Sequence, residues 1–320
     1  KTEIAGLIGP NGAGKTTVFN LLTKVYQPTM GTIMLNGRDT AGMNTAQANK
    51  LGIARTFQNI RLFDNMSVED NVRIGLHNQV RYGMLSGIFR MPGYWRGERE
   101  MHERALDLLS IFDMQDLANH QAGSLPYGAQ RRLEIVRALA TNPSLLLLDE
   151  PLGALDLQLR RQMQLEHKRL QKKLGITFVY ITHDQEEAIN MSDRIGVMHE
   201  GVLEQLGTPN EVYYQPQTSY VADFVGNANI LHKNGETFAI RSENILMNGE
   251  AACTQEAVVV EKSFAGGQLR ILFGLPDGQT LTASRYGIDN DLQPGQKVQI
   301  GWDAKDAVKV IDNDKDENHK

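Results

Sequence analysis

Gly9-Pro10-Asn11-Gly12-Ala13-Gly14-Lys15-Thr16 matches the complete pattern G-x-x-x-x-G-K-[ST]. The apolar run Ile4 to Ile8 precedes this stretch, and Thr16 to Leu22, which has helical spacing, follows it. A strand, a glycine-rich loop and a helix in this order surround a phosphate with backbone N–H groups. The sequence therefore predicts an α/β P-loop nucleotide-binding fold.

The loop also predicts roles for its own side chains. Lys15 is expected to reach the β- and γ-phosphates of ATP, and the Thr16 hydroxyl is expected to bind Mg²⁺. A glycine-rich turn with an incidental lysine is the alternative, and the flanking strand and helix argue against it. The predicted phosphate-binding set is Gly9, Pro10, Asn11, Gly12, Ala13, Gly14, Lys15, Thr16 and Thr17.

A second nucleotide element lies further along the chain. The run Leu145 to Leu148 is typical of a buried strand, and it ends in Asp149 and Glu150. In P-loop NTPases an acidic residue at such a strand end holds Mg²⁺, which predicts Asp149 as a metal ligand. The neighbouring Glu150 is predicted to polarise the attacking water. A strand ending in two solvated acids is the alternative.

Length, charge and cysteine content exclude some classes of function but do not identify one. At 320 residues the chain is long enough for two domains. A net charge of −5 argues against a general nucleic-acid binder. The single cysteine, Cys253, excludes an internal disulfide and fits a reducing compartment. No apolar run approaches the roughly 20 residues of a membrane-spanning helix, so a membrane role requires a partner.

Four further motifs appear in a fixed order along the chain. They are Arg55-Thr56-Phe57-Gln58, Ser124-Leu125-Pro126-Tyr127-Gly128-Ala129-Gln130, Gly153-Ala154-Leu155-Asp156 and Thr182-His183-Asp184. With the P-loop and the acidic pair, this order resembles the ATP-binding cassette (ABC) ATPases. Chromosome-maintenance ATPases share such a head, but they need long heptad-bearing arms, which are missing here.

The resemblance implies site residues. Gln58 would be the Q-loop residue that senses the γ-phosphate through Mg²⁺ and the attacking water, and His183 would be the switch histidine. Asp156 belongs to the D-loop. Leu125 and Gly128 belong to the signature motif, which faces the P-loop of a second cassette.

The resemblance also implies partners and a location. Two cassettes, identical or closely related, would stack head to tail around two ATP molecules. Integral membrane permease subunits would dock in a groove near the Q-loop, and a solute-binding protein would act indirectly. The cassette would lie peripherally on the cytoplasmic face of the bacterial inner membrane. No nucleic-acid partner is expected.

The signature motif departs from the usual Leu-Ser-Gly-Gly-Gln. Pro126, Tyr127 and Ala129 replace the serine, the first glycine and the glutamine. The loss of the serine removes one hydroxyl donor to phosphate. We interpret the motif as a subfamily variant, and a non-hydrolysing or impaired regulatory cassette is the alternative.

The two halves of the chain resemble different importer ATPases. Residues 1–150 resemble those for branched-chain amino acids, whereas residues 151–320 resemble those for spermidine and putrescine. The change falls near Leu148 to Pro151. We hypothesise a composite gene that lacks its natural start, and a native mosaic subfamily is the alternative. The predicted substrate is a polyamine or a branched-chain amino acid.

After Gly226 the sequence pattern changes to short segments that alternate as strands do. The expected strands are Ala257 to Lys262, Gln268 to Phe273, Gln279 to Ala283 and Lys297 to Trp302, separated by turn signals. They predict a small all-β barrel, which resembles a transport-associated OB (TOBE) domain. We therefore expect an ABC domain at 1–225 with a helical subdomain at about 60–140, an OB-like domain at 226–311 and a disordered tail at 312–320.

Overall fold

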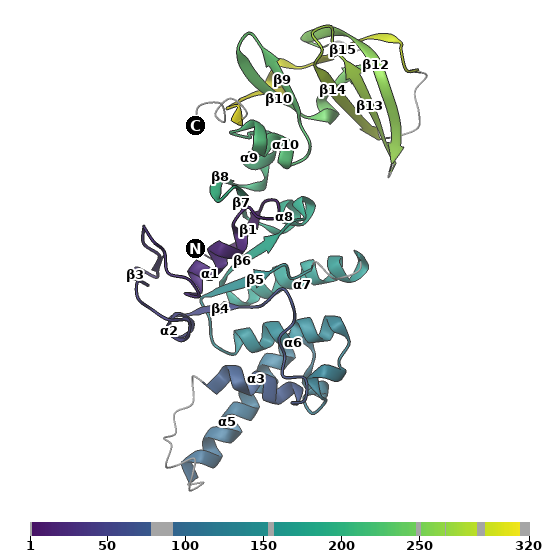
Figure 1. The fold of residues 1–320 in the computed structure, drawn as a ribbon. Coiled ribbons are helices and arrows are strands. Elements are labelled where there is room, and N and C mark those ends of the chain that lie inside the picture. Colours follow the sequence, from purple (N-terminus) through teal and green to yellow (C-terminus); the bar gives the residue numbers. More distant parts are fainter. Residues whose placement is uncertain are drawn as a thin grey trace. The chain divides into compact units, whose positions relative to one another are not determined.

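The computed structural model describes residues 2–77, 92–152, 157–247, 251–265, 267–286 and 292–313. The chain forms two compact units (Figure 1). The first contains Lys1–Arg194 and Met198–Val202, and the second contains Ile195–Val197 and Leu203–Lys320.

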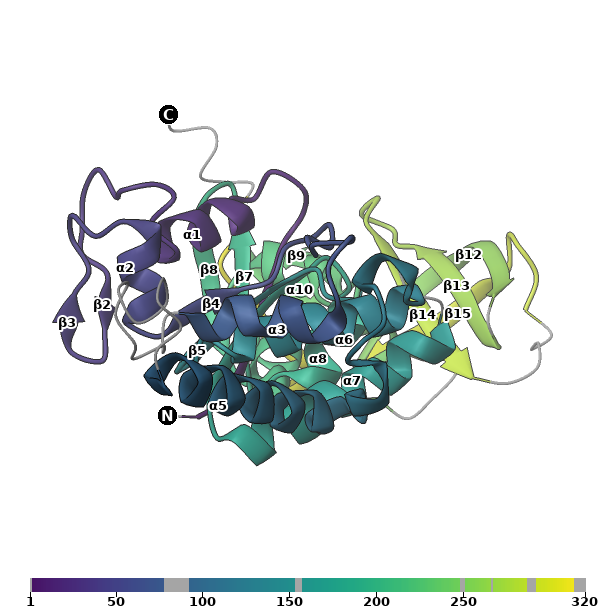
Figure 2. The same ribbon diagram turned by 90° about the horizontal axis from the view of Figure 1, so that it is seen from below.

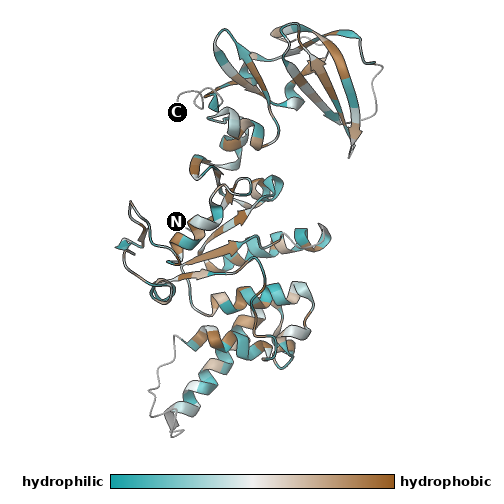
Figure 3. Cartoon of the chain, viewed as in Figure 1, coloured by the Kyte–Doolittle hydropathy of each residue, from teal (hydrophilic) through white to brown (hydrophobic). Residues whose placement is uncertain are grey.

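The first unit is built around parallel strands. Strands β4 (Ile53–Arg55), β5 (Leu145–Asp149), β6 (Thr177–Thr182) and β1 (Ile4–Ile8) lie side by side in that order. All three pairings are parallel. The strands are strongly apolar (Figure 3), as expected for parallel strands that are covered on both faces.

Helices cover both faces of these strands, and β5 shows this most clearly. Leu146 and Leu148 pack in the same cluster as Met163 of α7 (Leu157–Leu174). Leu147 points to the other face and packs in the same cluster as Phe19 of α1 (Lys15–Leu22). Alternation along the strand divides these leucines between the two layers. The other elements here are α2 (Thr45–Lys50), α8 (Gln185–Met191), β2 (Met34–Leu35) and β3 (Arg38–Asp39).

A group of helices separates β4 from β5 in the sequence. It contains α3 (Val68–Leu76), α5 (Pro92–Leu109) and α6 (Tyr127–Leu139), which lie close together in Figure 2. Val72, Leu109 and Leu133 pack in its core. Within the described parts of the chain, no helix combines the length and the apolar composition needed to cross a membrane.

The second unit contains two antiparallel sheets and two short helices. Strands β16 (Ala307–Val310), β10 (Glu236–Ile240) and β9 (Asn229–Lys233) form one sheet. The other follows the order β11 (Leu246–Met247), β15 (Lys297–Trp302), β12 (Cys253–Ala265), β13 (Gln268–Gly274) and β14 (Thr280–Tyr286). Strands β7 (Arg194–His199) and β8 (Val202–Gly207) have residues in both units, and helices α9 (Pro209–Tyr214) and α10 (Ser219–Phe224) belong to the second.

The fold class predicted from the sequence is confirmed in both units. Of the four expected C-terminal strands, Lys297–Trp302 forms with the expected bounds and the other three form with shifted ends. The expected domain boundary at 225/226 stays a prediction; Ala222 of α10 packs in one cluster with Ala239 of β10. At the expected tail, Asn313 donates its backbone N–H to Ser219 Oγ at 3.1 Å. Residues 314–320 lie outside the described residues.

Candidate nucleotide site

The predicted site motifs follow the carboxyl ends of neighbouring parallel strands. The P-loop follows β1, Gln58 follows β4, Glu150 follows β5, and His183 follows β6. In open α/β sheets, ligands bind at this edge of the sheet. The order of the strands therefore gathers motifs that lie far apart in the sequence.

The P-loop backbone requires its glycines. A Cβ on Gly9 would lie 2.4 Å from the carbonyl oxygen of Met198, so only glycine fits this close approach. Gly14 caps the N-terminus of α1 with a φ of 92°, in the left-handed region that favours glycine. The loop therefore leads directly into a helix whose N-terminus attracts anions.

Lys15 lies folded against its own loop. Its side chain is only 6% exposed, and its Nζ donates hydrogen bonds to the carbonyls of Gly9 at 2.7 Å and Pro10 at 2.9 Å. Burial lowers the pKa of Lys15, while the nearby carboxylates of Glu150 and Asp149 act in the opposite direction. The ammonium therefore lies against the backbone of the loop that is predicted to hold the phosphates.

Asp149 is paired with an arginine to which the sequence analysis assigned no role. Arg55 donates from Nη2 to Asp149 Oδ2 at 2.5 Å, and from Nη1 to Asn20 Oδ1 at 2.7 Å. This guanidinium connects β4, β5 and α1. Arg55 stands inside the quoted Q-loop motif, but its type and spacing did not reveal the pairing.

The structure brings Gln58, Glu150 and His183 together. Gln58 Nε2 donates to Glu150 Oε2 at 2.8 Å. His183 Nδ1 lies 3.5 Å from Glu150 Oε1. The two oxygens of one carboxylate thus face residues from two different strand ends. This arrangement suits a carboxylate that acts on a water molecule beside two polar neighbours.

Glu150 has an unusual backbone conformation. Its φ is 42°, in the left-handed region that non-glycine residues rarely adopt. Its N–H donates to the carbonyl of Ile181 at 3.1 Å. Strain of this kind persists where surrounding contacts hold the residue, and it concentrates at functional sites.

The signature residues lie in a different environment. Leu125 packs in the core of the helical group, and a Cβ on Gly128 would lie 3.2 Å from Leu159 Cδ2. Helix α6 begins at Tyr127, inside the signature motif, and Pro126 is its N-cap residue. Gly128 is therefore the second residue of the helix. Asp156 falls outside the described residues.

The donor set fits a magnesium ion that arrives with phosphates. Asp149 and Thr16 offer oxygen ligands, which Mg²⁺ prefers. Among the described residues, no group of three or more His, Cys, Asp or Glu side chains could hold a metal without further ligands. Mg²⁺ in nucleotide sites is held by one or two protein ligands together with substrate phosphates.

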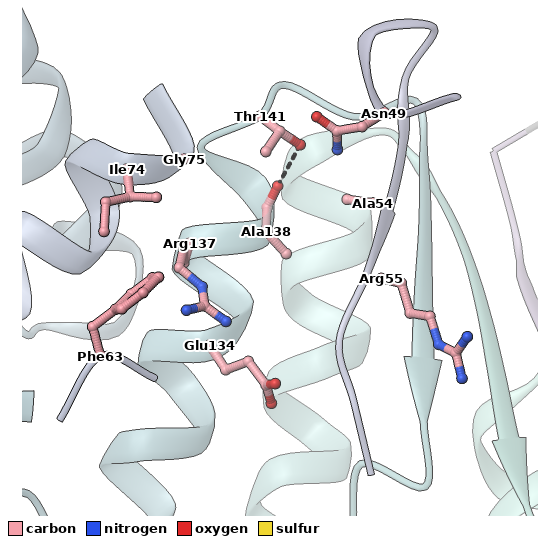
Figure 4. A pocket seen from close by; sticks show the side chains of 10 residues that line it. All are labelled: Asn49, Ala54, Arg55, Phe63, Ile74, Gly75, Glu134, Arg137, Ala138 and Thr141. Carbon is pink, nitrogen blue, oxygen red and sulfur yellow. Dashed lines mark hydrogen bonds between the residues drawn. The ribbon is translucent and has the colours of Figure 1, made fainter. Parts of the chain in front are cut away.

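A pocket of about 250 Å³ lies beside the site (Figure 4). Arg55 and Glu134 line it, and Phe63, Ile74 and Arg137 complete much of its wall. The Arg137 guanidinium carbon lies 5.8 Å from the centre of the Phe63 ring, and burial lowers the pKa of Arg137. The pocket therefore offers an apolar surface next to a cation.

Comparison with known proteins identifies the family. The ABC transporter family matches residues 1–153, and the TOBE domain family matches residues 238–309. The spermidine/putrescine import ATP-binding protein PotA of Thermobifida fusca is 37% identical over 305 residues, which cover 95% of this chain and 69% of that protein. The chain belongs to the ATP-binding subunits of ABC transporters.

Other relatives agree with this assignment. The PotA protein of Bacillus anthracis is 37% identical over 313 residues, covering 96% of this chain and 90% of that protein. The ABC transporter cassette MJ1267 in its ADP conformation gives a TM-score of 0.59 at 29% identity, with 70% of this chain and 87% of that chain covered. The cassette MJ0796, in a dimeric post-hydrolysis state with ADP and Pi, gives a TM-score of 0.54 at 29% identity. The match covers 65% of this chain and 86% of that chain.

As a member of this family, the chain is an ATP-binding, transport-coupled ATPase with an ABC cassette and a TOBE domain. The polyamine-import relatives span both halves of the chain, because their matches cover 95% and 96% of it. They do not support the interpretation that the first half comes from a branched-chain amino-acid system. The comparisons also do not support the alternative that the chain is a non-hydrolysing or impaired regulatory cassette.

Proposed function

We propose that the chain is the ATP-hydrolysing subunit of a polyamine importer of the spermidine and putrescine class. The observation that carries this proposal is the near full-length similarity to spermidine/putrescine import proteins, at 37% identity over 95% of the chain. The convergence of Gln58 and His183 on Glu150 supports the hydrolytic part of the proposal.

The side chains divide the work of hydrolysis. Glu150 accepts a proton from the attacking water. Gln58, which is hydrogen-bonded to the Glu150 carboxylate, orients that water. His183 donates a hydrogen bond toward the γ-phosphate, and Lys15 neutralises phosphate charge. Mg²⁺, when bound with ATP, supplies a Lewis acid that Asp149 and Thr16 would hold, with Gln58 beside it.

The proposed partners follow from the signature motif and the pocket of the first unit. A second cassette would place its signature residues, Leu125 and Gly128, over the P-loop of this chain. A dimeric cassette is described for MJ0796. The pocket beside Arg137 is the proposed docking place of a permease subunit, because an acidic residue on that subunit would pair with the cation. A solute-binding protein then acts through the permease, and the chain lies peripherally at the inner membrane.

We also propose the domain boundaries of the sequence analysis for the whole protein. The cassette would occupy residues 1–225 and the TOBE domain residues 226–311. Limited proteolysis followed by mass spectrometry checks these boundaries, because linkers are cut before packed domains. Cleavage within α9 or α10 before cleavage near Gly226 would contradict the boundary.

Reconstitution in vesicles tests the proposed function. The chain is combined with its permease and solute-binding protein, and ATP hydrolysis is measured with spermidine, with putrescine and with leucine. We expect the two polyamines to stimulate hydrolysis and leucine to leave it unchanged. Stimulation by leucine alone would contradict the polyamine assignment and leave the ATPase assignment intact.

A further inference from the structure

We propose that Arg131 is a positioning residue that fixes Gln58 and Glu150 relative to each other, and that Glu134 holds Arg131 in place. This inference rests on the proposed function, because it concerns the geometry of the hydrolytic site. Neither residue belongs to the predicted ATP-binding set. Both lie on α6, one turn apart, and they are 2% and 1% exposed.

The guanidinium of Arg131 uses every one of its N–H groups. Nε donates to the carbonyl of Pro151 at 3.3 Å, and Nη2 donates to the carbonyls of Gln58 at 2.9 Å and Glu150 at 3.3 Å. Nη1 donates to the carbonyl of Phe57 at 2.6 Å and to Glu134 Oε2 at 2.6 Å. Five donors meet five acceptors, which is the full capacity of an arginine.

Glu134 completes the arrangement from the same helix. Its Oε1 accepts the backbone N–H of Phe57 at 3.3 Å, while its Oε2 accepts from Arg131. The two side chains therefore hold Phe57 through both its N–H and its carbonyl group. Glu134 is also the counter-charge of the buried guanidinium. The nearby His167 is neutral at ordinary pH, because burial and then the charge of Arg131 lower its pKa to about 4.

These contacts join the two segments that carry the hydrolytic side chains. The Q-loop segment contributes the carbonyls of Phe57 and Gln58, and the turn after β5 contributes those of Glu150 and Pro151. Glu150 needs such support because its φ of 42° is strained. The hydrogen bond from Gln58 to Glu150 therefore depends on a side chain that reaches both backbones.

A purely structural ion pair would behave differently from a positioning pair. Buried ion pairs can often be replaced by apolar residues of similar size without loss of stability. Replacement of both partners, Arg131→Met with Glu134→Leu, therefore separates the two roles. The matched control is Arg132→Met with Glu166→Leu. It removes a pair between α6 and α7 that is bonded at 2.7 and 2.9 Å and does not involve Gln58 or Glu150.

The experiment measures the thermal midpoint, the ATP dissociation constant and the kcat of basal ATP hydrolysis for the full chain. We expect the Arg131/Glu134 double variant to fold with a lower thermal midpoint, because four backbone carbonyls lose a hydrogen-bond donor. It should bind ATP like the wild type, with kcat reduced about 100-fold, the order of loss that a 1 Å misplacement causes. The control pair should keep the wild-type kcat. A double variant with wild-type kcat would overturn the proposal.

Arg131→Lys covers the case in which the double variant does not fold. Lysine keeps the charge beside Glu134 but offers three donors to five acceptors. We expect reduced kcat at unchanged ATP affinity, and a wild-type kcat overturns the proposal. If the wild type itself does not hydrolyse ATP, the proposed function fails, and the inference fails with it.

Discussion

Each unit of the molecule buries an arginine, and the two arginines do different things. Arg241, in the second unit, is 5% exposed and donates to the carbonyls of Tyr213, Ala222 and Val225. These carbonyls lie at the last turns of α9 and α10, where helices have unpaired acceptors. Arg131, in the first unit, donates to the carbonyls of Gln58 and Glu150 instead. A buried arginine therefore indicates a functional site only when the segments that it joins carry functional residues.

The cores of the two units also differ in how many charged residues they bury. The main core of the second unit is apolar, with Phe273, Ile300 and Trp302 among its members. The first unit buries Lys15, Asp149 and other charged residues near the carboxyl ends of its strands. We infer that the first unit carries the chemistry, and that the second contributes stability and contacts.

The largest expected effect comes from a matched change in the two units. Glu150→Gln should reduce ATP turnover by roughly 10²–10⁴-fold, the contribution typical of a general base. Glu261→Gln, on the exposed side of β12, should leave turnover unchanged. Steady-state hydrolysis of both variants checks the contrast. Equal rates in the two variants would remove Glu150 from its proposed role.

A core truncation in the second unit should change stability without changing chemistry. Phe273 is fully buried, and Phe273→Ala should cost about 3–5 kcal/mol of unfolding free energy because it leaves a cavity. Denaturant unfolding followed through the fluorescence of the buried Trp302 measures this loss. ATP affinity, measured in native buffer, should stay the same. A parallel loss of ATP affinity would show that the units are not separable.

A pH series tests the buried acids of the first unit. Burial raises the pKa of Glu187 to about 7 from 4.5. Stability linked to its protonated form is present below pH 4.5 and is lost as the pH rises through about 7. Glu187→Gln should therefore gain stability over the wild type between these values, by up to about 3 kcal/mol above pH 7. Thermal midpoints at several pH values measure this difference.

The exposed neighbour on α8 provides the control for this series. Glu186→Gln should track the wild type at every pH, because Glu186 is exposed. A Glu187→Gln advantage that is independent of pH would contradict the assigned cause.

Helix caps should show the smallest effect, and the two units should behave alike. Asn44 in the first unit and Thr208 in the second each form a capping box. Asn44→Ala and Thr208→Ala should each cost about 1 kcal/mol. Differential scanning calorimetry checks both losses, and ATP turnover should not change. A cap variant that lowers turnover would show that local stability limits the chemistry.

The fold and the motif residues could be predicted because both leave local signals. Short stretches of sequence are enough to recognise the P-loop pattern, the apolar run before Asp149 and the turn signals between the C-terminal strands. The capping box at Thr208 likewise involves only Thr208 and Glu211, three residues apart. These features depend on neighbours in the sequence, so the pattern alone defines them.

The residues that organise the site could not be predicted in this way. Arg131 contacts the Q-loop segment across 73 or more positions, and Arg55 reaches Asp149 across 94. Only the i, i+3 spacing of Arg131 and Glu134 was visible, and that spacing also fits a solvated helix face. Their roles depend on tertiary packing.

Uptake of labelled spermidine into vesicles that contain the reconstituted importer tests the central claim most directly. ATP or a non-hydrolysable analogue is supplied on the side of the cassette, with wild-type chain or Glu150→Gln. The account predicts accumulation only for the wild type with ATP. Equal accumulation with the analogue, or with Glu150→Gln, would contradict the claim that hydrolysis at Glu150 drives import.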